Sequence, residues 1–264
     1  MSDILNVLFL GDVVGRPGCR ALFIGLKTLS KKYNSDLVIV NGENAAEGFG
    51  ITPVIADQFF TSGVDIITTG NHIWQKEEIL TYMSVNPRIL RPENYPDGAP
   101  GKGYCTYKVK GFDVAVINLQ GRVRMMNLNC PFIYGRKLVK KLKKNTNIII
   151  VDFHAEDPEE KESLGMYLDG LVTAVLGTHT HVQTGDERIM PGGTAYISDV
   201  GMIGPVNSVI GFDKNIALKR SLTQMPLKMV VAENPAVING VFLQIDTATG
   251  KAKKIERIWE MCSV

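Results

Sequence analysis

The chain has 264 residues, 45% of them hydrophobic, and a formal net charge of +2. This length suits one large α/β domain, and the near-balanced charge excludes a bulk electrostatic attraction to duplex nucleic acid or to an anionic membrane. The four cysteines show no CxxC spacing, and no apolar run approaches the roughly 18 residues of a membrane span. We therefore expect a cytoplasmic protein with reduced thiols and no membrane partner.

The first part of the chain alternates short apolar runs with helical patterns. The apolar runs predict strands at residues 4–10, 37–40 and 64–68. The helical patterns between and after them cover residues 17–32, 53–61 and 75–83. This β-α-β-α order favours a parallel sheet that is covered by helices.

The remainder begins with an irregular stretch rich in proline, glycine and asparagine, at residues 86–103. Further strands are predicted at 104–109, 114–118, 148–153 and 172–176, and helices at 135–144 and 159–168. After Gly177 we predict a helix at 215–222 and short strands at 188–190, 194–198, 228–232, 240–245 and 254–259. The short strands suggest a second, antiparallel sheet. We expect residues 1–264 to form one domain, with a small cap contributed by about 82–136.

Short polar clusters follow five of the predicted strands. The residues in these clusters are Asp12, Glu43, Asn44, Asn71, His72, His154, His179 and His181. Because ligands bind outside the carboxyl ends of parallel strands, we expect the clusters to meet at one sheet edge. Two carboxylates, amide oxygens and imidazoles exceed what one zinc ion needs and suit two metal ions that share a bridging carboxylate. This donor set favours Fe, Mn, Zn or Co.

The order of these motifs resembles that of the calcineurin-like metallophosphoesterases. The chain departs from that superfamily at two points: Val14 replaces a usual histidine, and Asn41-Gly42-Glu43-Asn44 replaces a usual Gly-Asp-x-x-Asp motif. Both departures are similar to the narrower YmdB-like phosphodiesterase family. The similarity continues through residues 11–18, 41–46, 71–74 and 255–258, and so covers nearly the whole chain.

The resemblance implies a fold, a set of ligands and a reaction. The fold is a four-layer α/β/β/α sandwich with two mixed sheets flanked by helices. One metal ion is held by Asp12, Glu43, Asn44 and His181, and Glu43 bridges to a second ion that is completed by Asn71, His154 and His179. The ions are expected to be Fe or Mn, with Zn as the alternative. We also expect a homo-oligomer.

The implied reaction is hydrolysis of phosphodiester bonds, including those of 2′,3′-cyclic nucleotides. A metal-bridging hydroxide attacks phosphorus, and His72 is the catalytic general acid that protonates the departing oxygen. His72→Ala is then expected to keep its metal and lose turnover.

Several alternatives stay open on the sequence alone. The same site suits a phosphomonoesterase or a ribonuclease. A regulatory RNA- or protein-binding module is a further alternative, because residues 136–144 form a basic helix. Phe49 and Phe132 are expected to pack in the core or a lid, with base stacking as the alternative. Asp152 is expected to point away from His154.

Overall fold

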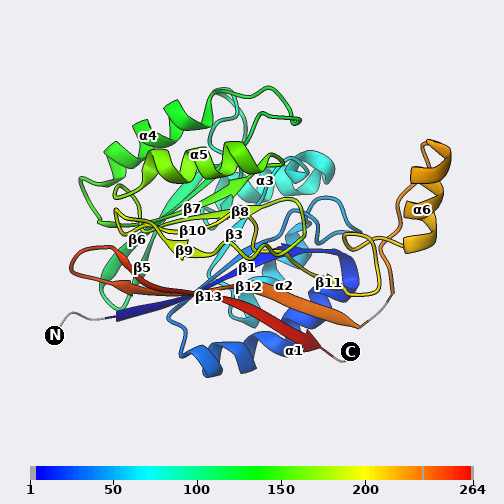
Figure 1. The fold of residues 1–264 in the computed structure, drawn as a ribbon, viewed down its shortest axis with the longest axis horizontal. Coiled ribbons are helices and arrows are strands. Elements are labelled where there is room, and N and C mark those ends of the chain that lie inside the picture. The colour runs from blue at the N-terminus through cyan, green and yellow to red at the C-terminus, as the bar shows by residue number, and fades with distance from the viewer. Residues whose placement is uncertain (1–3, 234, 263–264) are drawn as a thin grey trace.

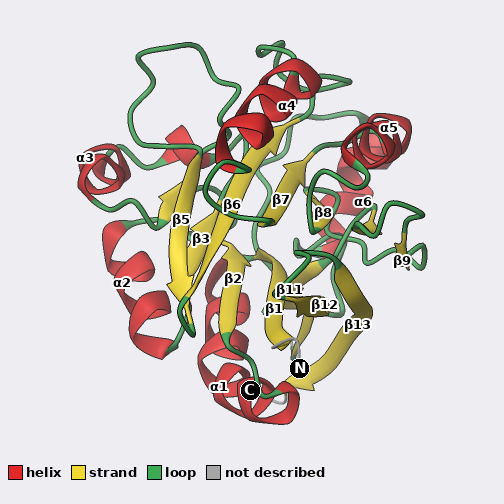
Figure 2. Ribbon diagram, turned by 90° about the vertical axis from the view of Figure 1, so that its left-hand side faces the viewer, coloured by secondary structure: helices red, strands yellow, loops and turns green. Residues whose placement is uncertain are grey.

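The computed structural model describes residues 4–233 and 235–262, which form two mixed β-sheets packed face to face with helices on both outer sides (Figures 1 and 2). The helices are α1 (Gly15–Tyr33), α2 (Pro53–Ser62), α3 (Glu78–Val85), α4 (Pro131–Leu142), α5 (Pro158–Leu168) and α6 (Lys214–Thr223), with a short 3-10 helix η1 (Ile73–Gln75). The layer order confirms the predicted α/β/β/α sandwich.

The first sheet, sheet A, has the strand order β13-β12-β11-β1-β2-β3-β4. These strands are β1 (Ile4–Val13), β2 (Leu37–Asn41), β3 (Ile66–Thr68), β4 (Ile89–Leu90), β11 (Met202–Pro205), β12 (Ala236–Asp246) and β13 (Ala252–Cys262). The run from β11 through β4 is parallel, as the β-α-β-α pattern predicted. β12 is antiparallel to β1, and β13 is antiparallel to β12.

The second sheet, sheet B, has the strand order β5-β6-β7-β8-β10-β9. Its strands are β5 (Tyr104–Val109), β6 (Phe112–Gln120), β7 (Ile148–His154), β8 (Ala174–Thr178), β9 (Arg188–Ile189) and β10 (Ala195–Ile197). The central strands β6, β7, β8 and β10 are parallel, whereas β5 and β9 pair antiparallel at the two edges.

The apolar core has three layers, one between each pair of neighbouring structural layers. Phe9 of β1 and Ile150 of β7 belong to the cluster between the two sheets. Leu22 of α1 belongs to the cluster between sheet A and its helices, and Leu164 of α5 to the cluster outside sheet B. Because the strands are buried on both faces, they read as continuous apolar runs rather than as alternating patterns.

Two helix starts follow from local sequence chemistry. The Thr52 hydroxyl accepts a hydrogen bond from the backbone N–H of Ile55, and Pro53 occupies the first turn of α2. Asp157 caps α5 in the same way, with Pro158 following it. A proline in the first turn costs no helical hydrogen bond, because its nitrogen would have no partner there.

The structure corrects the prediction of a separate antiparallel sheet after Gly177. The strands predicted there are divided between both sheets, since β12 and β13 extend sheet A while β9 and β10 extend sheet B. Of the eleven residues of β12, all but one are buried, which fits a strand between two neighbours and not one with a solvent face. Residues 228–232 form no strand; Val231 makes only an isolated bridge to Phe212.

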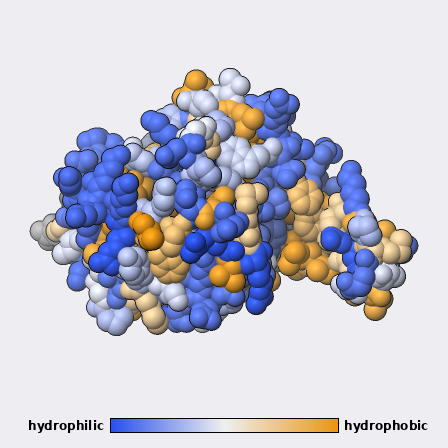
Figure 3. All heavy atoms as spheres, turned by 90° about the horizontal axis from the view of Figure 1, so that it is seen from above, coloured by the Kyte–Doolittle hydropathy of each residue, from blue (hydrophilic) through white to orange (hydrophobic). Residues whose placement is uncertain are grey.

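The segment after β11 includes an arm that projects from the body. In Figure 1, α6 stands apart at the right, and Figure 3 shows apolar side chains on this projecting part. Leu218 and Leu222 on α6 are 56% and 83% exposed. Within the described residues, no helix is long and apolar enough to cross a membrane.

The segment 82–136, predicted to contribute a small cap, contains strands of both sheets. β4 belongs to sheet A, and β5 and β6 belong to sheet B. A long connection, 91–103, joins β4 to β5, and a second, 121–130, joins β6 to α4. A separate cap stays a prediction.

Candidate metal centre

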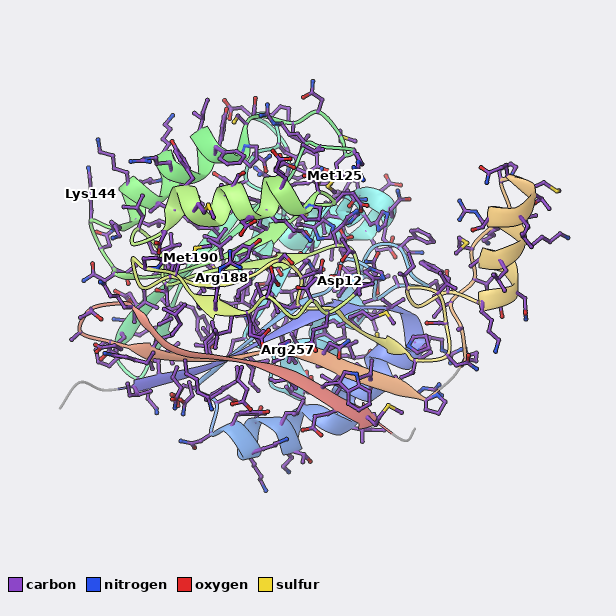
Figure 4. All side chains as sticks on the ribbon, in the orientation of Figure 1. Asp12, Met125, Lys144, Arg188, Met190 and Arg257 are labelled. Atoms are coloured by element: carbon purple, nitrogen blue, oxygen red, sulfur yellow. The ribbon has the colours of Figure 1, made fainter. Side chains whose placement is uncertain are left out.

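All eight polar residues predicted for the site lie in one connected cluster between the two sheets, where Asp12 is labelled in Figure 4. The prediction placed the clusters at the edge of one sheet. The structure instead supplies them from two sheets that face each other. Asp12, Glu43 and Asn71 come with β1, β2 and β3 of sheet A, whereas His154 and His179 come with β7 and β8 of sheet B.

Glu43, His154 and His179 form the densest part of the cluster. Each offers one ligand atom, and these atoms all lie within 4.8 Å of one another. The distance from His154 Nε2 is 3.0 Å to Glu43 Oε1, 3.0 Å to His179 Nδ1 and 3.1 Å to Asn71 Oδ1. Four of the predicted ligands therefore converge on one point.

Asp12, Asn44 and His181 form a second group beside the first. Asn44 Nδ2 lies 3.3 Å from Asp12 Oδ1, 3.3 Å from Glu43 Oε1 and 3.0 Å from His181 Nε2. His181 Nε2 is 3.8 Å from Asp12 Oδ1, and its Nδ1 contacts the carbonyl oxygen of Ile210 at 2.8 Å. Glu43 thus stands between the two groups, which is the place of a bridging carboxylate.

Residues that were not predicted from the sequence fix the orientation of His154, through the ring nitrogen Nδ1 that faces away from the cluster. Thr178 donates its hydroxyl proton to Asp152 at 2.7 Å, and its oxygen lies 2.9 Å from His154 Nδ1. Thr178 has one hydroxyl proton, so it accepts from an Nδ1–H of His154. That arrangement leaves Nε2 of the neutral ring as a lone pair directed at the cluster.

Asp152 was predicted to point away from His154, and this prediction is wrong. Residues two apart in a strand lie on the same face, so Asp152 and His154 both face the site. Burial raises the pKa of Asp152 to about 7, against the lowering effect of His154. Asn41, also missed, donates to Asp152 at 3.2 Å and accepts from the backbone N–H of Glu43 at 3.1 Å. Its place in the same Asn41–Asn44 run was the signal available.

The electrostatics of the cluster fit a bound cation. Burial alone would lower the pKa of His154, but the charge of Glu43 raises it to about 9. For the carboxylate of Glu43 the effect of burial has the opposite sign and would raise the pKa, but the interactions with His154 and His72 hold this pKa well below its ordinary value. Burial and the positive charge of His154 lower the pKa of His179 to about 3. A proton on His154 therefore balances Glu43 when no metal is bound, and a metal ion would replace it.

The atoms around His154 Nε2 fit a metal on chemical grounds as well. When Nδ1 carries the proton, Nε2 faces carboxylate and amide oxygens that are all acceptors, and such a set needs a cation at its centre. Gly70 leaves room for this convergence. A Cβ atom at Gly70 would lie 2.1 Å from His154 Cδ2 and 2.4 Å from Glu43 Oε2.

The two histidines of the His179–His181 segment have positive φ angles, 101° at His179 and 66° at His181. Such backbone conformations are costly for residues other than glycine and persist where the surroundings hold them. The carboxylate of Asp199 holds the residue between them, because its Oδ2 accepts from both the N–H and the hydroxyl of Thr180, at 3.0 and 2.8 Å. The same oxygen accepts from the buried ammonium of Lys161 at 2.8 Å.

His72 lies at the rim of the cluster rather than inside it. Its side chain is 25% exposed, and its Nδ1 lies 2.7 Å from Asn44 Oδ1 and 3.4 Å from Glu43 Oε1. Its backbone N–H donates to Glu43 Oε2 at 3.1 Å. Among the described residues, Nε2 of His72 has no hydrogen-bond partner, so it is available to a ligand.

Comparisons with known proteins cover the same residues. The chain is 47% identical over 254 residues to the 2′,3′-cyclic-nucleotide 2′-phosphodiesterase of Bacillus subtilis (strain 168), which covers 96% of each chain. It resembles the crystal structure of a novel phosphatase from Mycoplasma pneumoniae, with a TM-score of 0.94 and 35% identity, over 99% of this chain and 95% of the other.

A second solved structure is also similar to the chain along nearly its whole length. The chain matches a hypothetical protein from Thermus thermophilus with a TM-score of 0.90 and 36% identity, over 97% of this chain and 99% of the other. A model of the YmdB-like protein family matches residues 8–258, a range that contains every residue of the cluster described above. The chain therefore belongs to the YmdB-like protein family.

Proposed function

We propose that the chain is a phosphodiesterase that uses two metal ions to hydrolyse 2′,3′-cyclic nucleotides at the 2′-oxygen. The observation that carries this proposal is the convergence of Glu43, Asn71, His154 and His179, with the partly exposed His72 beside them. The substrate class is supported by the relative from Bacillus subtilis, which is named for this activity.

The ligand assignment follows the two groups of the cluster. Asp12, Glu43, Asn44 and His181 would hold one ion, and Glu43, Asn71, His154 and His179 the other. Oxygen donors mixed with imidazoles favour Fe or Mn, with Zn as the alternative. Bound there, the ions supply Lewis-acid stabilisation of the phosphate and lower the pKa of water to near neutrality.

Asn44 is the ligand whose present orientation differs from its assigned role. Its amide nitrogen faces Asp12 and His181, while its oxygen faces His72. Ligation requires the oxygen, so the amide would turn over on metal binding. The turned amide would then offer its N–H to Nδ1 of His72.

His72 supplies the proton that the leaving oxygen needs. Its Nδ1 contacts the Asn44 side chain, and its Nε2 has no hydrogen-bond partner among the described residues. In the hydrolysis, the oxygen of water forms a bond to phosphorus and gives one proton to solvent, the bond from phosphorus to the 2′-oxygen breaks, and the proton on Nε2 passes to that oxygen, to be replaced from solvent. The product is a nucleoside 3′-phosphate.

Product analysis tests the proposal most directly. The chain, loaded with Mn²⁺ or Fe²⁺ under anaerobic conditions, is given 2′,3′-cAMP, and the products are separated by chromatography. We expect 3′-AMP without 2′-AMP, and no turnover for Glu43→Gln. Equal amounts of the two products would contradict the proposed position of cleavage.

The rival activities on the same site need their own comparison. Rates on bis-p-nitrophenyl phosphate, p-nitrophenyl phosphate and a short oligoribonucleotide separate a phosphodiesterase from a phosphomonoesterase and a ribonuclease. Faster hydrolysis of the monoester, or of the oligoribonucleotide over 2′,3′-cAMP, would replace the proposed function.

A regulatory RNA- or protein-binding role, and a homo-oligomer, stay predictions. Two cations of the basic helix are engaged with aromatic rings, since Arg136 lies 4.8 Å from the ring centroid of Tyr167 and Lys141 lies 5.1 Å from that of Tyr104. These contacts favour a solvated face over an RNA-binding strip.

A further inference from the structure

Phe49 presents an exposed aromatic ring directly beside the candidate general acid. It is 36% exposed and lies in the loop that follows Glu43 and Asn44. Its ring centroid is 5.1 Å from that of His72, with the two planes at 76°. The core or lid packing expected for Phe49 therefore accounts for only part of its surface.

The ring of Phe49 is held in place from one side. It stacks on the buried ring of Phe212 at a centroid distance of 5.5 Å and an interplanar angle of 28°. Gly48 makes this close approach possible, because a Cβ atom there would lie 2.9 Å from Phe212 Cε1 and 3.0 Å from Val231 Cγ2. Within the loop, the backbone N–H of Phe49 donates a hydrogen bond to the carbonyl oxygen of Ala46 at 3.0 Å, which forms a turn. Phe49 is thus a braced platform with a free side.

A cavity of about 460 Å³ lies next to this platform. Phe49, Arg16, Lys76, Glu47 and Glu233 contribute to its lining, together with residues 228–231, which follow α6. Three of the lining residues stand four or five positions after residues of the metal centre: Arg16 after Asp12, Phe49 after Asn44 and Lys76 after His72. Phe49 is the lining residue whose ring contacts His72. Its volume lies within the range of small-molecule sites, and it combines an aromatic face with cationic and carboxylate side chains.

We propose that this cavity is the subsite for the nucleobase, with Phe49 as the stacking platform; this inference rests on the proposed function. In a 2′,3′-cyclic nucleotide, the ribose alone separates the phosphate from the base, so a base must lie close to the metal centre. Phe49 lies one ring away from His72, on the rim. Every base has a π-face, so stacking here tolerates all four bases. Arg16 provides donors for base oxygen and nitrogen atoms, whereas Lys76 Nζ also lies 3.7 Å from Glu47 Oε2.

The test compares a cyclic nucleotide with a cyclic phosphodiester that lacks both the base and the ribose ring, so the effect of each Phe49 variant on the ratio of the two rates isolates what Phe49 contributes. Kinetics are measured on 2′,3′-cAMP and on glycerol 1,2-cyclic phosphate, which keeps the five-membered cyclic phosphodiester but has no base. For Phe49→Ala we expect the ratio of kcat/KM between these substrates to fall by roughly 5- to 150-fold, through KM, as loss of one stacked base predicts. Phe49→Trp is expected to keep the ratio, whereas Phe49→Leu, which preserves apolar packing against Phe212, is expected to lose it.

A matched control and a binding measurement complete the test. Phe132→Ala removes a ring that contacts Tyr167 on the outer side of sheet B, and it should leave the ratio unchanged. By calorimetry, the metal-loaded wild type should bind 3′-AMP more tightly than inorganic phosphate, and Phe49→Ala should lose this difference. An equal loss on both substrates, with 3′-AMP binding retained, would overturn the subsite. Absence of hydrolysis of either cyclic ester by the wild type would instead overturn the proposed function.

Discussion

The four histidines of the chain lie at different depths, and two of the three candidate ligands are the deepest. The side chains of His154 and His181 are 0% and 7% exposed, whereas those of His179 and His72 are 21% and 25% exposed. The deeper rings lie where a metal ion would be shielded from water. His72 is at the depth at which a substrate oxygen can reach it.

Replacement of His72 by alanine should reduce turnover of 2′,3′-cAMP by about 10²–10⁴-fold, because the leaving oxygen loses its proton donor. Metal content, measured by mass spectrometry, should equal that of the wild type. The loss should be smaller on bis-p-nitrophenyl phosphate, since p-nitrophenolate leaves without a proton. A His72→Ala protein without metal would show instead that His72 is a ligand.

Replacement of Gly70 by alanine should abolish metal binding without a change at any ligand. The added methyl group would lie in the space that His154 and Glu43 share, 2.1 Å and 2.4 Å from their nearest atoms. Gly185→Ala is the control, because a Cβ there meets only Arg257 at 3.7 Å. If Gly70→Ala and Gly185→Ala bind metal equally, His154 and Glu43 can move apart to accommodate the methyl group, and the prediction is wrong.

Residues of the centre were predictable where they stand at a strand end in a polar cluster, as Asp12 and Glu43 do. The residues that orient them were harder to find. Nothing in the local sequence assigns a role to Thr178, because that role comes from its contacts to residues of the adjacent strand. Asp152 is different, because its spacing from His154 already placed both on one face of the strand. Its role depends on the cross-strand contact to Thr178, and local sequence does not give that contact.

At the scale of elements, a buried ion pair ties three segments of the chain together. Lys161 of α5 and Asp199, between β10 and β11, have side chains that are 3% and 1% exposed. Asp199 also accepts from the backbone N–H of Gly201, whose carbonyl accepts from the N–H of Asp12. The carboxylate of Asp199 therefore positions both the His179–His181 segment and Gly201, which pairs with Asp12 of β1.

Asp199→Asn should destabilise the protein by about 3–5 kcal/mol in denaturant unfolding, because Lys161 would stay buried without its counter-charge. Adding Lys161→Met should recover much of this loss, since the double variant buries no lone charge. Metal affinity should stay about 10–100-fold weaker in both proteins, as expected when a group that orients ligands is changed. Wild-type metal affinity in the double variant would limit the pair to a role in stability.

The elements themselves were predictable to different degrees for physical reasons. Helix starts such as Thr52-Pro53 are local signals, and the structure has them where predicted. Strand partners are not local, because Val7 pairs with Leu243 from the other end of the chain. The residues of β12 are apolar on both faces, which shows that the strand is central but not which sheet contains it.

At the scale of the whole molecule, the candidate metal centre lies between two sheets that meet mainly through apolar packing. Asp12 and Glu43 belong to sheet A and its loops, whereas His154 and His179 belong to sheet B and its loops. A metal ion bound to both sides would therefore act as a cross-link between the sheets. It binds the folded chain and not the unfolded one, so it must also raise stability.

Metal loading should raise the thermal midpoint measurably. At a free metal concentration of 100 times Kd, binding stabilises the fold by about 2.7 kcal/mol. For a chain of this size that corresponds to a rise of roughly 5–10 °C, measured by calorimetry against chelator-treated protein. Glu43→Gln should lose most of the rise, because Glu43 is the proposed ligand of both ions. A variant that rises as much as the wild type would argue against a bridging role.

The position of β1 has a consequence for synthesis on the ribosome. β1 lies inside sheet A, with β2 on one side and β11 and β12 on the other. β2 follows soon after β1, but β12 is made more than two hundred residues later. Until then one edge of an apolar strand has no partner, and such an edge is a template for pairing with other chains. A nascent chain that stalls before β12 should therefore aggregate and depend on chaperones, because its first strand is completed by one of its last.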